Sequence, residues 1–430
     1  MIPYAEFIAR RRAAKPHDGI TVDDTQIGDH LFPFQKDIVK FACQVGRPAI
    51  WADTGLGKSR MMLTWCSLMG ETTLIIAPLA VADQTVSEAE KIGLDARYIR
   101  SHDEIDGPGI YVTNYEMIDR FDPGTFDAVA LDEASILKNS TGKTRNRLID
   151  QFADVRYRSA WTATPAPNDP EELTSQAEFL GHSKRNNMLA AYFVNDMKLG
   201  WRLKGHARIP FAEWLNSWAI AVKMPSDLGY PDDGYILPGL NVIPEIVEAD
   251  IAPADGELFA ATVGGVGDRA RVRRETMEAR IKRAAELVEN EPAEPWVFWV
   301  ELNDESEALA RMIVGAVQVR GSQTAEEKAR ILRDFADGNI TRLIIKPSIG
   351  AMGLNWQHCA RIGFVGLGDS YEKYYQAIRR CYRFGQKRVV NAHVIVSRIE
   401  QTSAENVARK EKQANTITED MIAARKRVAA

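Results

Sequence analysis

Short apolar runs alternate with stretches that carry apolar residues at helical spacing along most of this 430-residue chain. Uninterrupted runs of about four to eight apolar residues are typical of parallel strands that are buried on both faces. In the first half such runs lie at residues 49–51, 73–78, 110–115, 126–131 and 158–161. The second half repeats the rhythm at residues 242–251, 296–300, 317–321, 342–346, 361–367 and 389–396. Alternating strands and helices predict doubly wound α/β domains with parallel sheets.

A short segment rich in proline and glycine, Leu237-Pro238-Gly239-Leu240, separates the two series and is expected to be a linker. We therefore expect domain 1 at residues 1–240 and domain 2 at residues 241–430. Residues of about 181–236 do not follow the strand–helix rhythm, so we expect a helical insertion at the end of domain 1.

One stretch after the first apolar run predicts a phosphate-binding loop. It reads Ala52-Asp53-Thr54-Gly55-Leu56-Gly57-Lys58-Ser59, with Ala52 where the standard pattern has glycine. In such loops the backbone N–H groups, together with the N-terminus of the following helix, point at phosphate oxygens. We expect ATP to contact Thr54, Gly55, Leu56, Gly57, Lys58 and Ser59. Lys58 would reach the β- and γ-phosphates and the Ser59 hydroxyl would hold Mg²⁺. The alternative is a plain glycine turn between a strand and a helix.

Two carboxylates, Asp132 and Glu133, follow the apolar run at 126–131. Ligands of open α/β sheets bind at the carboxyl ends of the strands, which is where these residues fall. We expect Asp132 to hold Mg²⁺ through water and Glu133 to orient and deprotonate the attacking water. The alternative is an acidic helix start, because Asp and Glu favour the first turn of a helix.

Phe34 and Gln35 precede the phosphate loop by about twenty residues. A glutamine side chain offers one donor and one acceptor to the adenine edge, and an aromatic ring can stack on the base. We expect both residues to contact adenine. The alternative places Phe34 in the core and Gln35 on the surface.

The first half of the chain resembles superfamily 2 helicases. Residues Ala52–Ser59, Asp132–Ser135 and Thr162–Pro165 resemble motifs I, II and III of that superfamily. Residues 136–139 and 166–173 extend motifs II and III, and residues 31–35 open the domain, as in the Swi/Snf-like branch. Ser135 stands where the branch usually has histidine, which leaves open how hydrolysis is coupled to motif III.

The second half resembles the same branch in motifs V and VI, at residues 348–355 and 376–386. The resemblance implies that Gln376, Arg380 and Arg383 act in catalysis, and that Gly353 and Asn355 contribute to the ATP site. Arginines that approach the γ-phosphate from a second domain neutralise the charge that develops in the transition state. Arg379 replaces the family's glycine and adds a third cation.

The resemblance covers about residues 31–400 and implies two RecA-like domains in tandem, with ATP and Mg²⁺ as cofactors. It implies an ATP-dependent DNA translocase or helicase that acts on duplex or branched DNA. Residues 201–207 and 225–230 resemble a segment of phage and prophage Swi/Snf-like helicases, which implies a role in phage replication or recombination.

DNA contacts are expected at two places. Loop residues near Thr113, Arg320 and Ser348 are implied by the resemblance, and Arg202 and Lys204 belong to the aromatic and basic insertion. Basic side chains that pair with phosphates and aromatic side chains that stack on nucleobases can together hold a DNA strand. The alternative for the insertion is that its tryptophans form a core of their own.

Composition bears on the partners and location of the protein rather than on its chemistry. The net charge of −5 does not announce a nucleic-acid partner, although a local basic groove can bind phosphates on an acidic protein. No apolar run approaches the roughly 18–20 residues of a membrane span, so we expect no membrane contact. The four cysteines are far apart and the seven histidines do not cluster, which argues against zinc. We expect a cytoplasmic monomer, in the host cytoplasm if phage-encoded. An RNA helicase and an ATP-switched, non-catalytic DNA-binding assembly factor remain alternatives.

Overall fold

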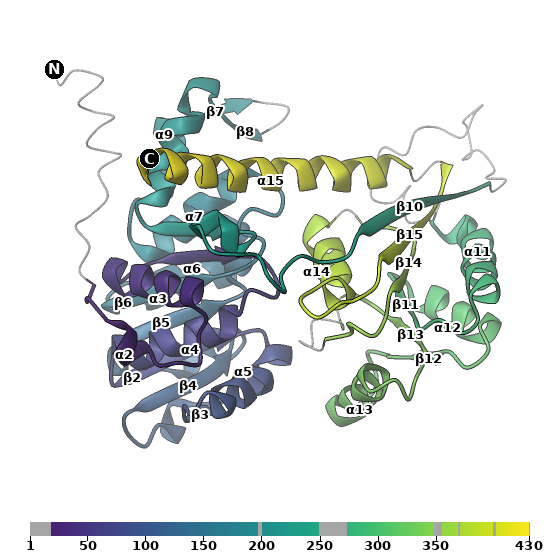
Figure 1. The fold of residues 1–430 in the computed structure, drawn as a ribbon, viewed down its shortest axis with the longest axis horizontal. Coiled ribbons are helices and arrows are strands. Elements are labelled where there is room, and N and C mark those ends of the chain that lie inside the picture. The colour runs from purple at the N-terminus through teal and green to yellow at the C-terminus, as the bar shows by residue number, and fades with distance from the viewer. Residues whose placement is uncertain are drawn as a thin grey trace. The chain divides into compact units, whose positions relative to one another are not determined.

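The chain folds into two compact α/β units (Figure 1). The computed structural model describes residues 19–196, 200–248, 273–347, 349, 355–368, 370–398 and 401–429. Unit 1 comprises Met1–Tyr235 and Glu411–Ala430, and unit 2 comprises Ile236–Lys410. Each unit is a parallel sheet with flanking helices, which confirms the predicted fold class of two RecA-like domains.

A seven-stranded sheet in the order β3-β4-β2-β5-β6-β1-β9 forms the centre of unit 1, and its neighbouring strands pair in parallel. Its strands are β1 (Ala49–Ala52), β2 (Thr72–Ala77), β3 (Ala96–Tyr98), β4 (Gly109–Asn114), β5 (Ala128–Asp132), β6 (Tyr157–Trp161) and β9 (Ala219–Val222). Five of them, β1, β2, β4, β5 and β6, coincide with the predicted apolar runs. All four residues of β1 are buried, as expected for a strand covered on both faces.

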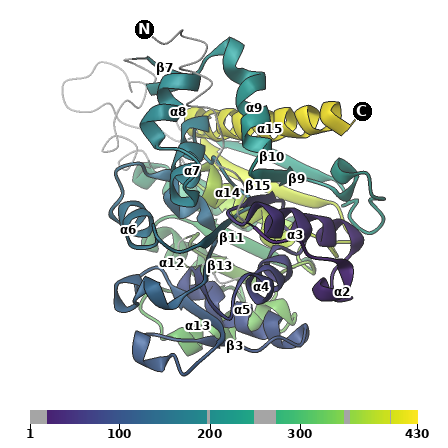
Figure 2. The same cartoon turned by 90° about the vertical axis from the view of Figure 1, so that its left-hand side faces the viewer.

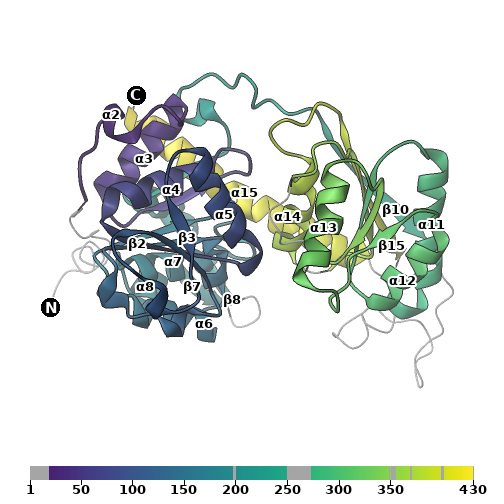
Figure 3. The same cartoon turned by 90° about the horizontal axis from the view of Figure 1, so that it is seen from below.

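Two hydrophobic cores lie on the two faces of this sheet (Figure 3). Successive side chains of a strand point to opposite faces, so Trp51 joins one core and Ile50 the other. The core around Ile50 is covered by α2 (Asp24–Ile27), α3 (Pro33–Val45), α4 (Lys58–Met69) and α5 (Leu79–Lys91). The core around Trp51 is covered by α6 (Lys143–Gln151), α7 (Leu173–Leu180), α8 (Arg185–Tyr192) and α9 (Arg208–Asn216).

The predicted insertion is not purely helical. Between α8 and α9 it forms an antiparallel hairpin of β7 (Phe193–Asp196) and β8 (Gly200–Leu203), which lies beside these helices in Figures 1 and 2. It then supplies β9, which pairs with β1 and completes the main sheet. Trp214 and Trp218 are buried in the core of unit 1 together with Trp51, so these two tryptophans are core residues, but not of a separate core formed by the insertion.

The C-terminal helix α15 (Gln401–Ala429) begins in unit 2, and its last part belongs to unit 1. Ile417, Met421 and Ala424 recur at helical spacing and join the core of unit 1. Asp420 accepts hydrogen bonds from Arg208 at the start of α9. The sequence prediction placed all of 241–430 in domain 2, whereas the packing groups residues 411–430 with unit 1.

Unit 2 contains a six-stranded sheet in the order β10-β15-β14-β11-β13-β12, and its neighbouring strands also pair in parallel. The strands are β10 (Leu240–Val247), β11 (Trp296–Val300), β12 (Val317–Gln318), β13 (Arg342–Ile345), β14 (Arg361–Val365) and β15 (Val390–Ser397). In the part of unit 2 that the structure describes, the helices besides the start of α15 are α11 (Met277–Asn290), α12 (Asn303–Met312), α13 (Ala325–Ala336) and α14 (Tyr371–Cys381). Helices α11 and α12 cover one face of the sheet, and α13 and α14 cover the other (Figure 3). Thr324 and Glu327 form the predicted capping box of α13.

Across the parts of the chain that the structure describes, no helix combines the length and the apolar character needed to cross a membrane. The four cysteines are free thiols, and each is buried.

Candidate functional site

The phosphate loop and the acidic pair lie at one edge of unit 1. Strands β5, β6 and β1 are neighbours in the sheet and run parallel, so their carboxyl ends lie at the same edge. The phosphate loop (residues 52–59) leaves β1, the acidic pair (Asp132 and Glu133) ends β5, and Thr162 follows β6. This edge is where ligands bind in open α/β sheets.

The phosphate loop has the backbone that a phosphate cradle requires. Gly55 and Gly57 have φ angles of 90° and 83°, which glycine adopts without strain. A Cβ at Gly57 would also lie 2.3 Å from the side-chain nitrogen of Gln35, so a larger residue would displace that amide. Helix α4 begins at Lys58, whose amine donates to the carbonyls of Ala52 (2.8 Å) and Asp53 (3.3 Å). Lys58 and Ser59 are half-buried in the first turn of this helix, whose N-terminus favours anions.

The side chain of Gln35 is hydrogen-bonded to the backbone of the phosphate loop. It is buried, its amide nitrogen donates to the carbonyl of Leu56 (2.8 Å), and its oxygen accepts from the backbone N–H of Phe32 (2.9 Å). In this structure both ends of the side chain are therefore engaged within unit 1. The adenine contact of Gln35 stays a prediction.

The aromatic available for stacking is Phe32 rather than Phe34. Phe34 is only 3% exposed and packs edge-on against Tyr235 at 5.5 Å, which fits the alternative of a core residue. Phe32 is 55% exposed and lies next to Gln35 at the start of α3. The sequence reasoning missed Phe32, although the Phe-x-Phe spacing alone does not tell which ring faces the core.

The acidic pair is held in an unusual backbone conformation. Glu133 has φ 52° and ψ 53° and is the one residue other than glycine with a positive φ in the described parts of the chain. The left-handed conformation costs roughly 1–2 kcal/mol for a residue with a Cβ. The backbone N–H of Glu133 donates to the Asp132 carboxylate (3.1 Å), and the Thr162 hydroxyl donates to the Glu133 carboxylate (3.4 Å). Such local strain is characteristic of functional sites.

Electrostatics set Asp132 apart. Burial, followed by the neighbouring charge of Glu133, raises its pKa to about 7, although Lys58 acts in the opposite direction. A carboxylate whose surroundings disfavour its charge is suited to a cation, and Mg²⁺ at nucleotides takes one or two carboxylates together with phosphate oxygens. The donor set of Asp132 and the Ser59 hydroxyl therefore fits Mg²⁺ bound with ATP.

Helix α14 carries the predicted catalytic residues of unit 2. Gln376 and Arg380 are four residues apart on the helix, and Arg383 follows three residues later, just beyond the end of α14. Arg379 precedes Arg380 on the helix. Its guanidinium carbon lies 5.0 Å from the ring centre of Tyr375 and 5.5 Å from that of Tyr382. The cation that replaces the family's glycine is thus accommodated between two aromatic rings.

Gln386 fixes the turn that follows α14 and contains Arg383. This buried amide donates to the carbonyls of Cys359 (3.1 Å) and Cys381 (3.2 Å). Its oxygen accepts from the backbone N–H groups of Lys387 and Arg388. Gln386 is the last residue of the stretch at 376–386 that resembles motif VI, and the sequence alone assigned it no role.

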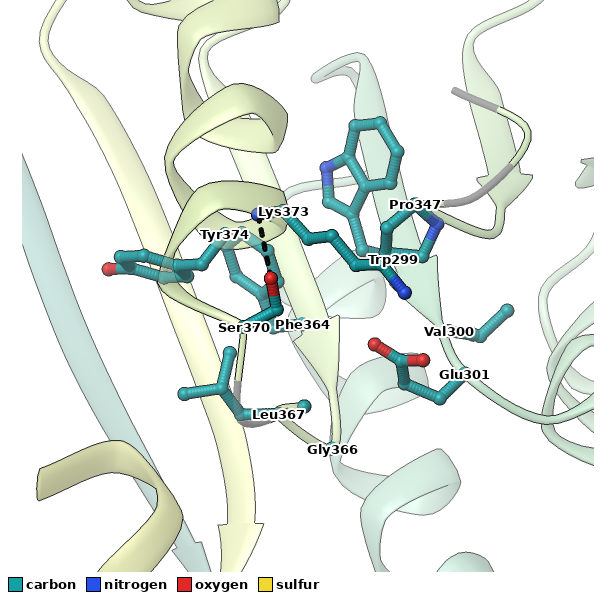
Figure 4. A pocket seen from close by; sticks show the side chains of 11 residues that line it. Trp299, Val300, Glu301, Pro347, Phe364, Gly366, Leu367, Ser370, Lys373 and Tyr374 are labelled. Atoms are coloured by element: carbon teal, nitrogen blue, oxygen red, sulfur yellow. Dashed lines mark hydrogen bonds between the residues drawn. The ribbon is translucent and has the colours of Figure 1, made fainter. Parts of the chain in front are cut away.

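The carboxyl edge of the unit 2 sheet differs from that of unit 1. A small cavity of about 10 Å³ lies there, where β11, β13 and β14 end, with Glu301, Pro347 and Lys373 among its lining residues (Figure 4). A cavity of this size holds about one water molecule and is far too small for a nucleotide. The Ser370 hydroxyl accepts from the Lys373 N–H and caps α14 beside the cavity (Figure 4).

The predicted DNA contacts have different environments. Thr113 is fully buried and its hydroxyl donates to the carbonyl of Ile99 (2.9 Å), so its side chain does not fit a phosphate contact. Lys204 donates to the carbonyls of Ala190 and Ala191, which caps the end of α8. Arg202 is exposed on β8, 4.0 Å from Asp196.

In unit 2, Arg320 is exposed two residues after β12, and its guanidinium donates to Gln318 (3.0 Å). This placement is compatible with the predicted DNA contact, which stays a prediction. Asn355 is exposed, whereas Ser348 and Gly353 lie outside the described residues.

Comparisons with known proteins agree with the residue patterns. Residues 279–385 match the helicase conserved C-terminal domain. The chain is 22% identical over 416 residues to the SWI/SNF-related matrix-associated actin-dependent regulator of chromatin subfamily A-like protein 1 of Xenopus tropicalis, covering 89% of this chain and 44% of that protein. It is 23% identical over 427 residues to the DNA annealing helicase and endonuclease ZRANB3 of Mus musculus, covering 85% of this chain and 38% of that protein.

Among solved structures, the chain is similar to the Sulfolobus solfataricus SWI2/SNF2 ATPase core in complex with dsDNA, with 16% identity and a TM-score of 0.46 over 94% of this chain and 96% of that one. The chain spans less than half the length of the two curated relatives named above. The residues that match the helicase C-terminal domain lie in unit 2, and over most of its length the chain is similar to a SWI/SNF-related protein and to a DNA annealing helicase.

Proposed function

We propose that this protein is an ATP-dependent DNA translocase or helicase, which couples hydrolysis to movement on, or remodelling of, duplex or branched DNA. The observation that carries the proposal is the meeting of the phosphate loop and the acidic pair at one sheet edge, in a chain that also has the helicase C-terminal domain. The first two supply what ATP hydrolysis needs, and the third is the part that helicases add.

The residues of unit 1 have distinct tasks in this proposal. The amine of Lys58 turns from the loop carbonyls of Ala52 and Asp53 to the β- and γ-phosphate oxygens. Ser59 and Asp132 would hold Mg²⁺, which would supply neutralisation of the phosphate charge. Glu133 accepts the proton of the attacking water, and Thr162 keeps its carboxylate in place.

In unit 2, Arg380 and Arg383 supply positive charge to the γ-phosphate during turnover. Planar guanidinium groups suit this task because they bind phosphate oxygens with two parallel hydrogen bonds. Hydrolysis then depends on domain closure, which is how a motor couples chemistry to movement. The fixed turn around Gln386 supports this task because it restrains the backbone on the C-terminal side of Arg383.

DNA as the partner is supported by the relatives, one of which is named as a DNA annealing helicase. The exposed side chains of Arg202 and Arg320 remain candidates for phosphate contacts. The phage setting is the finest part of the proposal and is supported by residues 201–207 and 225–230 alone. We also propose that the protein works as a monomer in the cytoplasm.

A single ATPase assay tests the proposal. Turnover is measured without nucleic acid and with duplex, forked, four-way and single-stranded DNA, and with RNA of the same sequences. We expect several-fold stimulation of kcat by duplex or branched DNA and little by RNA. The salt dependence of this stimulation should be steep, because phosphate contacts release counterions.

The matched control is Glu133→Gln, which keeps the size of the side chain and removes the base. It should bind nucleotide and DNA without turnover. If no form of DNA raises kcat, the proposal fails; stronger stimulation by RNA would favour the RNA helicase instead. A single turnover followed by arrest on DNA would indicate an ATP-switched assembly factor.

A further inference from the structure

Tyr115 reaches the acidic pair from a strand that is not its neighbour. It follows β4 directly, and its hydroxyl donates to the backbone carbonyl of Asp132 at 2.6 Å. Strand β2 lies between β4 and β5 in the sheet, so the tyrosine side chain crosses the end of β2. The ring is 7% exposed and belongs to the core around Trp51.

The bonded carbonyl lies where the regular strand ends. Pairing of β5 with β2 stops at Leu131, one residue before Asp132, while pairing with β6 continues to Asp132. The phenol thus supplies a hydrogen bond to β5 just beyond its last ladder pair with β2. A buried carbonyl that lost this bond would carry a desolvation cost.

Immediately after this carbonyl the backbone enters the left-handed conformation of Glu133. A strained residue persists only where its surroundings hold it. The bonds that hold it include those from Tyr115 to the carbonyl before Glu133, from the Glu133 N–H to the Asp132 carboxylate, and from Thr162 to the Glu133 carboxylate. The carbonyl of Glu133 also accepts from the N–H of Ile136 and the hydroxyl of Ser135. Among these donors, Tyr115 is the one that lies outside the motifs with which hydrolysis was associated.

We propose that Tyr115 is a positioning residue for hydrolysis: its hydroxyl holds the Asp132–Glu133 peptide in the orientation that aims the Glu133 carboxylate at the attacking water. The inference rests on the proposed ATPase function. The tyrosine itself touches no substrate; it acts through the peptide. Removing its hydroxyl lets the left-handed turn relax towards an ordinary conformation and moves the carboxylate.

The chain offers a closely matched control four residues upstream. Tyr111 lies in β4 itself, is fully buried, and its hydroxyl donates to the backbone carbonyl of Gly107 at 2.7 Å; the same hydroxyl lies 3.2 Å from Asp106 and from Arg97. The Gly107 carbonyl is at the opposite end of β4, away from the acidic pair. Tyr111→Phe and Tyr115→Phe therefore each remove one hydrogen-bonded phenol hydroxyl, and only Tyr115→Phe affects the peptide before Glu133.

The experiment compares both variants with the wild-type chain in ATPase kinetics, urea unfolding and amide hydrogen exchange. We expect Tyr115→Phe to lower kcat by roughly tenfold with KM for ATP unchanged, since only the step aimed by Glu133 is impaired. Tyr111→Phe should shift the unfolding midpoint similarly and leave kcat unchanged. Exchange should accelerate in residues 132–137 of the Tyr115 variant alone.

An unchanged kcat in Tyr115→Phe, or an equal loss in Tyr111→Phe, would overturn the positioning role. Equal exchange of residues 132–137 in the two variants would overturn it as well. If the wild-type chain hydrolyses no ATP under any condition, the proposed function fails. The exchange comparison still decides in that case whether Tyr115 holds the peptide.

Discussion

Unit 1 and unit 2 share a layered architecture but treat buried charge in opposite ways. In unit 2, Arg280 and Glu305 are completely buried and form an ion pair of 2.7 Å. Arg280 also donates to Thr276, and the second oxygen of Glu305 accepts the backbone N–H groups of Glu301 and Leu302. Each charge is therefore met by an opposite charge and by further hydrogen bonds.

Unit 1 leaves its buried carboxylates in surroundings that disfavour their charge. Burial raises the pKa of Asp132 and also that of Glu172, each to about 7. Glu172 accepts two hydrogen bonds from Asn168, which only partly offset its burial. The difference teaches where to look for chemistry: a buried charge that the protein satisfies holds a fold together, whereas one that it does not satisfy marks a place for an external cation or proton.

Lys58→Ala should give the largest effect and would separate the two kinds of charge most clearly. Loss of the amine removes charge at the phosphates, so kcat should fall by about 10³-fold or more, with the free energy of unfolding nearly unchanged. Steady-state ATPase assays and urea unfolding measure both quantities. Lys36→Ala, which removes an amine paired with the exposed Asp29, serves as the control and should leave kcat intact. Substantial turnover in Lys58→Ala would contradict the assignment of the phosphate loop.

Arg383→Ala tests whether unit 2 takes part in chemistry through the turn that follows α14 rather than through its sheet edge. We expect kcat to fall by about 10²–10³-fold while nucleotide affinity is largely kept, because the guanidinium acts in the transition state. Fluorescent nucleotide titration and ATPase assays provide the two readouts. Arg388→Ala removes another arginine from the same segment, one that pairs with Glu294 at 2.7 Å, and should spare kcat. Loss of binding with kcat preserved would refute the transition-state role.

Glu305→Ala should break the buried ion pair between Arg280 and Glu305 in unit 2. It leaves the Arg280 guanidinium buried without its carboxylate, which costs about 3–5 kcal/mol of stability. Thermal unfolding should show an earlier transition, while nucleotide binding at temperatures below it is retained. A change of less than about 1 kcal/mol would mean that the pair is not the structural element inferred here.

Glu172→Gln addresses a carboxylate of unit 1 and should have the smallest effect. The pKa of Glu172 is 4.5 in its ordinary state and about 7 in the fold. Well below pH 4.5 the carboxyl is protonated in both the folded and the unfolded state, so its burial does not lower the free energy of unfolding. Between pH 4.5 and 7 it ionises only in the unfolded state, so the loss of stability grows over this range and is constant above it. Relative to the wild type, Glu172→Gln should therefore gain on the order of 1–3 kcal/mol between pH 5 and pH 8. Urea midpoints at the two pH values measure this gain, and an equal difference at both would contradict it.

The sequence was a good guide where local signals decide the structure. Glycines in a left-handed turn, a lysine that starts a helix and an apolar run before Asp132 each describe their own surroundings, so the nucleotide edge of unit 1 is assembled as expected. The capping box of Thr324 is read from four residues alone. The parallel sheets follow because runs buried on both faces have few other arrangements.

Features that depend on distant partners could not be predicted in this way. Phe34, rather than Phe32, is buried, and it packs against Tyr230 and Tyr235, about two hundred residues later in the chain. The hydroxyl of Thr113 is bonded to the carbonyl of Ile99, and the amine of Lys204 to the end of α8, whereas the DNA contact of Lys204 stays a prediction. The pattern of apolar positions does not say that β9, a strand of the insertion, pairs with β1.

The return of α15 to unit 1 has a consequence for biosynthesis. Met421 is part of the core of unit 1 yet is made long after Tyr235, the last residue of that unit's first segment. At translation rates of about 5–20 residues per second, the ribosome needs roughly 10–40 s to cover this interval. During that time the apolar surface that later receives Ile417 and Met421 is exposed, so the nascent chain presents a binding site for chaperones until the whole of α15 has emerged.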